Sequence, residues 1–246
     1  MSFNLQWSWP VFREYLFDGT LLDGAKITLE LTVVAQFLGI VLGILAALGK
    51  TSKVIPFRFV AELYIWLFRG TPVLVQILLW WQILPPSTPE FVTAFIALGL
   101  NEGAYMAEIV RAGLEAVDKG QTEAAHSLGM RYAQVMGRIV LPQAMRVIIP
   151  PTGNEFISML KTTSLVSTIS LAELLRSSQN IYECTGCDGA LAITPLLVIA
   201  ALYYLVLSTV FTFVQMYIES RLGDRRAQDP GWFRTLMGRG RLLFIS

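Results

Sequence analysis

The chain has 246 residues, of which 54% are hydrophobic and only 15% charged, and its formal net charge is +1. Soluble domains have about 25% charged residues, so this composition excludes an ordinary soluble protein and predicts an integral membrane protein. The few basic residues are spread between apolar stretches and do not gather on one face, which argues against nucleic acid as a partner.

The N-terminal residues do not resemble a cleaved signal peptide. Tryptophans, a proline and charges of both signs come before any long apolar run, whereas a signal peptide begins with a short basic region and an apolar core. We therefore expect residues 1–22 to form a separate segment and the first span to stay in the membrane.

Several stretches are suited to crossing a bilayer, which takes about 20 mostly apolar residues. The clearest are Ile27 to Leu48 and Leu191 to Tyr217, and Phe91 to Val110 follows a turn-like sequence, PPSTPE. The apolar stretch before that turn is interrupted by FRGTP, which ends in a proline suited to a first helical turn. We expect an interfacial helix from about Pro56 to Phe68 and then a span that begins near Thr71.

The region from Ile139 to Arg176 is apolar enough to cross once, yet it contains four residues that disfavour helix, namely Pro142, Pro150, Pro151 and Gly153. We expect these residues to interrupt the helix. Irregular backbone at membrane depth survives only where protein or a water-filled cavity covers it. Whether this region contains a re-entrant element is not decided by the sequence.

Five spans place 15 of the 19 basic residues on one side of the membrane and 4 on or toward the other. The basic side is expected to be cytoplasmic. The N-terminal segment is therefore predicted outside and the C-terminus inside, with a flexible cytoplasmic tail, 223–246, resting on anionic lipid or on a partner subunit. The longest cytoplasmic loop covers about residues 111–142.

This loop contains a short polar helix, which we expect from Thr122 to Met130. Thr122 is suited to capping it, Glu123 lies in the first turn where the helix dipole favours an acid, and Gly129 is placed to end it. Its alanines have small side chains, so another protein can approach the helix backbone closely. From these residues alone, a connector helix on the membrane surface and a docking helix are equally acceptable.

A resemblance favours docking. EAAHSLG, followed nine residues later by IVLP, resembles the complete EAA loop of bacterial ABC importer permeases, through Glu123, Ala124, Ala125, Gly129, Ile139, Leu141 and Pro142. Three further segments resemble the polar amino-acid branch of that family: FRGTPVLVQ, GAYMAEIVRAGLEAVDKGQTEAAHSLGM and LPQAMRVIIPPTGNEFISMLKTTSLVS. The likeness covers roughly residues 20–222 and implies an all-α, MetI-like permease domain at 23–222.

The resemblance also implies partners. The EAA loop would form a coupling helix that docks on an ABC ATP-binding subunit, present in two copies, which holds the ATP and Mg. This chain would bind no cofactor and would not itself be an enzyme. A second permease subunit, identical or similar, would complete the path in the bacterial inner membrane, and an extracytoplasmic solute-binding protein would deliver a polar amino acid.

Other functions find less support in the residues. The GKT of Gly49 to Thr51 lacks the earlier glycine and the strand context of a phosphate-binding loop. His126 is the single histidine, so neither a histidine metal site nor a catalytic triad is well supplied. A secondary transporter or channel without ATPase partners is the alternative, although such proteins often show paired broken helices and only one break-rich region is present.

Polar residues inside spans are functional candidates. Glu102 is suited to balancing a cationic substrate, or else to bonding a neighbouring helix. Asn154, Ser158 and Lys161 form one helical stripe that faces the substrate path or the partner permease, unless Lys161 pairs with Glu155.

The remaining candidates lie near the span ends. Glu108 and Arg111 are spaced for an i, i+3 pair that stabilises the exit of the span. Arg69 is predicted to brace the coupling loop, with gating or lipid contact as alternatives. Cys184 and Cys187 form a local disulfide on the outer side or remain free thiols. Which amino acid is carried, and whether the permease pairs with itself, the sequence leaves open.

Overall fold

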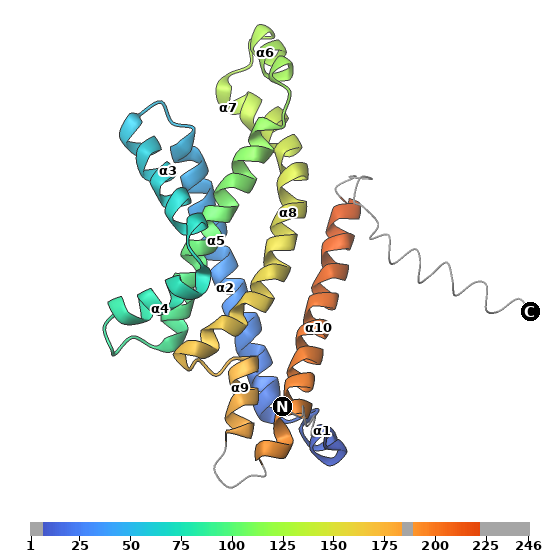
Figure 1. Cartoon of the computed structure of the whole chain (residues 1–246). Coiled ribbons are helices and arrows are strands. Elements are labelled where there is room, and N and C mark those ends of the chain that lie inside the picture. Colours follow the sequence, from blue (N-terminus) through green and yellow to red (C-terminus); the bar gives the residue numbers. More distant parts are fainter. Residues whose placement is uncertain (1–6, 184–188, 222–246) are drawn as a thin grey trace, which may run out of the picture.

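The computed structural model describes residues 7–183 and 189–221, and all regular secondary structure in this part of the chain is helical. The helices, labelled in Figure 1, are α1 (Trp9–Tyr15), α2 (Gly19–Lys50), α3 (Ile55–Gly70), α4 (Val73–Ile83), α5 (Glu90–Glu115), α6 (Lys119–Ser127), α7 (Tyr132–Val135), a π-helical turn (Met136–Val140), α8 (Leu141–Thr162), a 3₁₀ segment (Thr163–Ile169), α9 (Leu174–Tyr182) and α10 (Gly189–Arg221).

Helices α2 and α5 form the centre of the bundle and pack through glycines four residues apart on each helix. A Cβ atom added to Gly39 would overlap the Glu102 side chain, and one added to Gly43 would overlap Met106. Across the same contact, Gly99 and Gly103 receive Leu38 and Leu42. Small residues allow two helix backbones to approach closely, and the resulting van der Waals contact stabilises helix pairs in membranes.

The apolar stretch around FRGTP forms two helices joined at a sharp bend. Helices α3 and α4 are bent by 109° at residues 71–72. The side-chain amide of Gln76 closes the corner, donating to the Phe68 carbonyl at 2.8 Å and to Thr71 Oγ1 at 2.7 Å. Asn101 of α5 donates to the same Phe68 carbonyl at 3.1 Å and to Gln76 Oε1 at 3.0 Å. The carbonyls freed by the bend therefore find partners inside the protein, as membrane backbone requires.

The prediction of an interfacial helix followed by a complete span is wrong. Helix α3 runs beside α2 and α5, and its Ile65 is buried with Ala46 and Ala107. Helix α4 has 11 residues, about 16 Å at 1.5 Å per residue, whereas the apolar core of a bilayer is about 30 Å thick. Only α3 and α4 together are long enough to cross.

The prolines of α8 do not interrupt it, contrary to the sequence prediction. Pro142 lies in the first turn, and the helix continues through Pro150, Pro151 and Gly153 to Thr162. Side chains hydrogen-bond to carbonyls in this stretch: Thr152 Oγ1 donates to Ile148 at 2.8 Å, and Gln215 of α10 donates to Pro150 at 3.1 Å. Such partners are what allows proline in membrane helices. The break comes later, in the 3₁₀ segment that ends at Ser170 with φ 65°.

The bundle has two ends, as Figure 1 shows. Helix α1 and the start of α2 lie at one end, and α6 lies at the opposite end, toward which α10 also finishes. Helices α2 and α10 are each long and apolar enough to cross a membrane, and the bent α3–α4 pair is so when its two helices are taken together. Helices α5 and α8 have 26 and 22 residues, about 39 and 33 Å. Five crossings, by α2, α3–α4, α5, α8 and α10, agree with the expected architecture.

Candidate functional site

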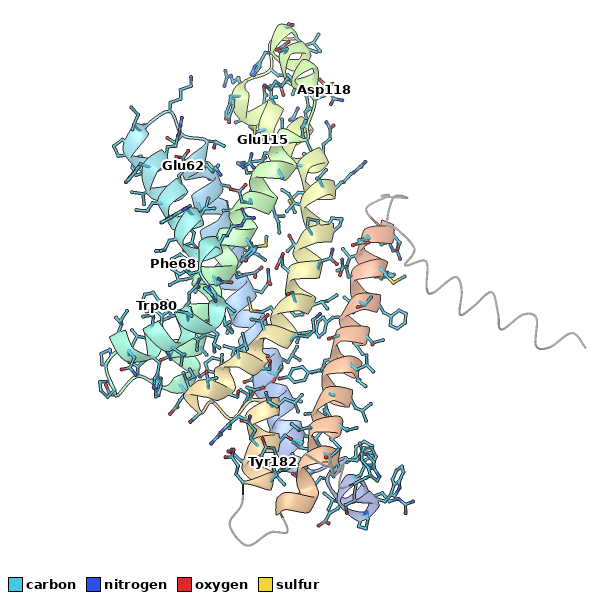
Figure 2. The ribbon with its side chains drawn as sticks, in the orientation of Figure 1. Glu62, Phe68, Trp80, Glu115, Asp118 and Tyr182 are labelled. Carbon is cyan, nitrogen blue, oxygen red and sulfur yellow. The ribbon has the colours of Figure 1, made fainter. Side chains whose placement is uncertain are left out.

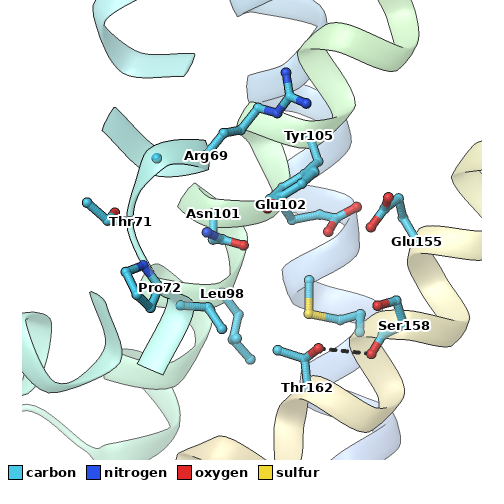
Figure 3. Close-up of a pocket in the computed structure, with 13 residues that line it drawn as sticks. Arg69, Thr71, Pro72, Leu98, Asn101, Glu102, Tyr105, Glu155, Ser158 and Thr162 are labelled. Carbon is cyan, nitrogen blue, oxygen red and sulfur yellow. Dashed lines mark hydrogen bonds between the residues drawn. The ribbon is translucent and has the colours of Figure 1, made fainter. Parts of the chain in front are cut away.

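A polar cavity of about 530 Å³ lies in the middle of the bundle, where the α3–α4 corner meets α5 and α8 (Figure 3). Its polar lining consists of Arg69, Thr71, Asn101, Glu102, Tyr105, Glu155, Ser158 and Thr162. A volume of this size falls within the range of small-molecule sites, roughly 300–1,000 Å³. It is therefore large enough to hold a small polar solute at membrane depth.

Glu102 is the most buried acid of the cavity, with only 4% of its surface exposed. Gln36 of α2 donates from Nε2 to Glu102 Oε1 at 3.0 Å, and Gly39 leaves the room that the Glu102 stem occupies. Glu155 of α8 faces Glu102 across the cavity, as Figure 3 shows. Ionisable groups inside a membrane are costly and mark substrate or ion pathways, so two facing carboxylates make this cavity the leading candidate site.

Arg69 is the cationic side chain of the cavity lining. Its guanidinium carbon lies 5.4 Å from the centre of the Tyr105 ring, within the range of a cation–π contact. Arg69 therefore lies on the cavity, and bracing of the coupling loop stays a prediction. A gating role for Arg69 stays a prediction.

The three residues of the predicted polar stripe of α8 lie in different surroundings. Ser158 lines the cavity, whereas Asn154 accepts a hydrogen bond from Gln215 of α10 at 3.1 Å and Lys161 is exposed outside the lining. Among the ion pairs of the described residues, none joins Glu155 to Lys161. In the sequence, Glu155 was an intramembrane acid and a possible partner of Lys161, but it was not among the residues named for the substrate path.

The coupling loop lies at the far end of the bundle from the N-terminus, and its helix, α6, begins three residues before the predicted start. Asp118 caps it, because Asp118 Oδ1 accepts the Gly120 amide at 2.6 Å (Figure 2). Helix α6 ends at Ser127, three residues before the predicted end, but the role predicted for Gly129 is confirmed: Gly129 has φ +79°, and the amides of Gly129 and Met130 donate to His126 and Ala125. These two bonds form a Schellman motif, which favours glycine at this position.

The surface of α6 is shallow and partly apolar. Ala125 is buried in a cluster with Val135 and Val140, against which Leu114 and Val117 of the preceding segment also pack, whereas Leu128 is 83% exposed. Glu123, Ala124 and Gly129 are exposed as well. A hollow of about 380 Å³ is lined by Gln121, Ala124, Ala125, Leu128, Met130, Arg138, Ile139 and Gln143. Residues of the EAA loop that are far apart in sequence therefore form one surface.

Two other sequence predictions have different outcomes. The Glu108–Arg111 pair is confirmed, with Arg111 Nη2 at 2.7 Å from Glu108 Oε2. Cys184, Cys187 and the tail 223–246 lie outside the described residues, so the disulfide and the lipid contact stay predictions.

Comparison with known proteins decides the family. Residues 39–224 match the binding-protein-dependent transport system inner membrane component family. The chain belongs to this family. It is therefore the membrane permease subunit of an ABC importer, a transport component that works with a separate ATPase and a binding protein in the inner membrane. The alternative of a transporter without ATPase partners is thereby set aside.

Relatives of this permease carry more specific names. It is 42% identical to the arginine transport system permease protein ArgU of Corynebacterium glutamicum, over 96% of this chain and 77% of the relative. It is 40% identical to the L-cystine transport system permease protein TcyB of Bacillus subtilis, over 87% of each chain.

Two solved structures share its fold. One, described as an amino acid ABC transporter with histidines, is 40% identical with a TM-score of 0.74, over 82% of this chain and 94% of the other. A chain of the MetNI methionine transporter, only 20% identical, has a TM-score of 0.62 over 87% and 99%. The latter likeness concerns the fold alone.

Proposed function

We propose that this permease passes polar amino acids inward through the cavity and that amino acids with cationic side chains are its preferred substrates. The observation that carries the proposal is the pair of carboxylates, Glu102 and Glu155, that face each other across the cavity.

The charges of the lining suit such a substrate. With both carboxylates in the ionised form, they and Arg69 together give the cavity a formal charge of −1. Arginine, lysine or protonated histidine carries +1 overall, since its side chain and α-amino group are positive and its carboxylate negative. The carboxylate would pair with Arg69 and the cationic groups with Glu102 and Glu155, so that the occupied cavity is electrically balanced. A neutral amino acid would leave one carboxylate without a partner in a medium where unpaired charge is costly.

The named relatives support an amino-acid cargo. ArgU of Corynebacterium glutamicum and ArtQ of Bacillus subtilis, which is 38% identical over 82% of this chain, are both named for arginine transport. TcyB is named for cystine, whose side chains carry a second amino and carboxyl group. The relatives agree on zwitterionic, polar cargo, and the cavity charges favour the cationic members of that class.

The assembly that we infer places α6 as the coupling helix on the ATP-binding subunit. Two such subunits would hold ATP and Mg, this chain would bind no cofactor, and a second permease, identical or similar, would complete the path. The segment 1–22 and the solute-binding protein would lie outside, and the tail 223–246 would lie in the cytoplasm. The exposed Ala124 of α6 and the exposed Leu128 directly after it support docking of a protein partner at this position.

The test is uptake of labelled amino acids by the reconstituted importer with its binding protein. Changing Glu102→Gln keeps the size and the bond to Gln36 but removes the charge, and we expect arginine or lysine uptake to fall at least about tenfold, the effect of 1.4 kcal/mol. Glu62→Gln on the exposed side of α3 removes one carboxylate of a surface ion pair and is the matched control. Unchanged arginine uptake by Glu102→Gln and Glu155→Gln would overturn the cationic assignment.

A further inference from the structure

Helices α2 and α5 are joined at their α6 end by an ionic chain of four side chains. Glu108 accepts from Lys50 Nζ at 2.5 Å with one oxygen, and from Arg111 Nη2 at 2.7 Å and Nε at 3.0 Å with the other. Arg111 also donates from Nη1 to Glu115 at 2.6 Å. Each oxygen of Glu108 therefore has its own cationic partner, one on each helix.

The Lys50–Glu108 contact differs from the other ion pairs. The Lys50 and Glu108 side chains are 28% and 18% exposed, whereas Lys26–Glu30 is 71% and 53% exposed and its atoms are 3.9 Å apart. Exposed pairs are weakened by water and salt, and partly buried pairs much less so. Among the ion pairs within residues 7–183 and 189–221, Lys50–Glu108 is the one that joins two membrane helices.

Its position links it to α6. Lys50 is the last residue of α2, where the carbonyl end of the helix favours a cation. Glu108 lies two turns before the end of α5, and α6 begins four residues after that end. Leu114 and Val117 pack on the cluster that contains Ala125 of α6 and also on the cluster that contains Ala47 of α2. The α6 contact and the ionic chain therefore meet on the same short stretch of helix.

We propose that Glu108 is a positioning residue that clamps the end of α2 to α5 through Lys50, so that α6 moves the two helices as one unit. The inference rests on the proposed function of α6 as the coupling helix. The glycine contacts join α2 and α5 deeper in the bundle, and nearer the ends Ala47 of α2 and Val110 of α5 share a buried apolar cluster. The ionic chain adds a directional tie at the last residue of α2. With the clamp, a push on α6 displaces both helices and thereby moves Gln36 and Glu102 together; without it, part of the push only bends the end of α5.

The decisive variant is Lys50→Met, which removes the tie and leaves Glu108 paired with Arg111, so no buried carboxylate is stranded. In the full importer, reconstituted with its binding protein, we expect molecules transported per ATP hydrolysed to fall at least about fivefold, the lower end of typical coupling between sites. Complex yield and substrate binding should not change. Lys50→Arg should restore the ratio, and Lys26→Met, which removes a lysine from the exposed pair of the same helix, should leave it at the wild-type value.

A second variant tests the mechanical role directly. In a chain whose Cys184 and Cys187 are serine, Lys50→Cys with Glu108→Cys should transport poorly per ATP, and joining the two thiols with a short bifunctional reagent should restore the ratio. A wild-type ratio in Lys50→Met, or no recovery after verified cross-linking, would overturn the clamp.

The inference and the function on which it rests can fail separately. Gly129→Val disrupts the end of α6 without touching the ionic chain. If Gly129→Val lowers transport per ATP and Lys50→Met does not, the clamp alone is wrong. If neither variant lowers it, α6 is not the coupling helix.

Discussion

Glu102 depends on two residues of α2 that have no charge of their own. The Gln36 amide holds one of its oxygens, and Gly39 gives its stem room against the helix backbone. The acid was visible in the sequence because it interrupts an apolar span, whereas its supports were not, since a glutamine and a glycine in a membrane helix have many uses. Ser158 was also placed correctly, but Tyr105 and Asn101 were missed. A cavity between several helices draws residues from faces that no single helical pattern connects.

At this scale, Gly39→Ala should destabilise the protein. The added methyl would overlap the Glu102 side chain, and overpacking of this kind costs about 1–3 kcal/mol. We expect the midpoint of thermal unfolding in detergent to fall and arginine uptake to fall with it. Gly19→Ala is the control in the same helix, because a methyl group there meets nothing within 4 Å. Equal unfolding midpoints for the two variants would refute the close packing of α2 on α5.

At the scale of elements, the existence of each helix was easier to predict than where it begins, where it ends and whether it continues through a proline. The ends of α6 illustrate why: Gly129 was correct because few other residues adopt φ +79°, whereas the start was misplaced because Asp118 and Thr122 are both good caps. The prolines of α8 were misjudged for a different reason. Their cost depends on partners such as Gln215, which is 65 residues from Pro150 along the chain.

The glycine at the end of α6 leads to a prediction about assembly. Gly129→Val forces a β-branched residue into a backbone conformation that it rarely adopts, and we expect it to lower co-purification of the ATP-binding subunit from mild detergent. Glu123→Lys should act in the same direction by reversing an exposed charge on α6. Gly137→Ala, also in the loop and with open space around it, is the control. Normal recovery of the ATP-binding subunit with Gly129→Val and Glu123→Lys would argue against docking at α6.

At the scale of the whole molecule, the apolar stretches together with the turn signals and the distribution of basic residues were enough to predict five crossings, but they could not reveal that one of them is bent. At the α3–α4 corner, the amides of Gln76 and Asn101 form hydrogen bonds that join α3, α4 and α5. Length and apolar composition also fail to single out α5 and α8, because the residues that line the cavity lower their hydropathy. The spans hardest to recognise are thus the ones that carry the site.

The distribution of basic residues predicts the orientation of this bundle. Phe17 at the N-terminal end is 79% exposed, and Lys53 at the α6 end is exposed as well. In a chain without its native cysteines, Phe17→Cys should react with a membrane-impermeant maleimide in intact cells, and Lys53→Cys only after the membrane is opened. The reverse pattern would show that the protein has the opposite orientation in the membrane, with α6 on the outer side and out of reach of a cytoplasmic ATPase.

The three charged side chains of the cavity stand on three different helices: Arg69 on α3, Glu102 on α5 and Glu155 on α8. The Phe68 and Thr71 carbonyls of the nearby corner already accept from Gln76 and Asn101, so we expect these charges to contribute much of the affinity for a zwitterion. Their spacing changes whenever the helices shift relative to one another. We therefore expect the affinity for the cargo to depend on how the helices are positioned relative to one another. The motion that opens the path inward should then also lower the affinity for the solute.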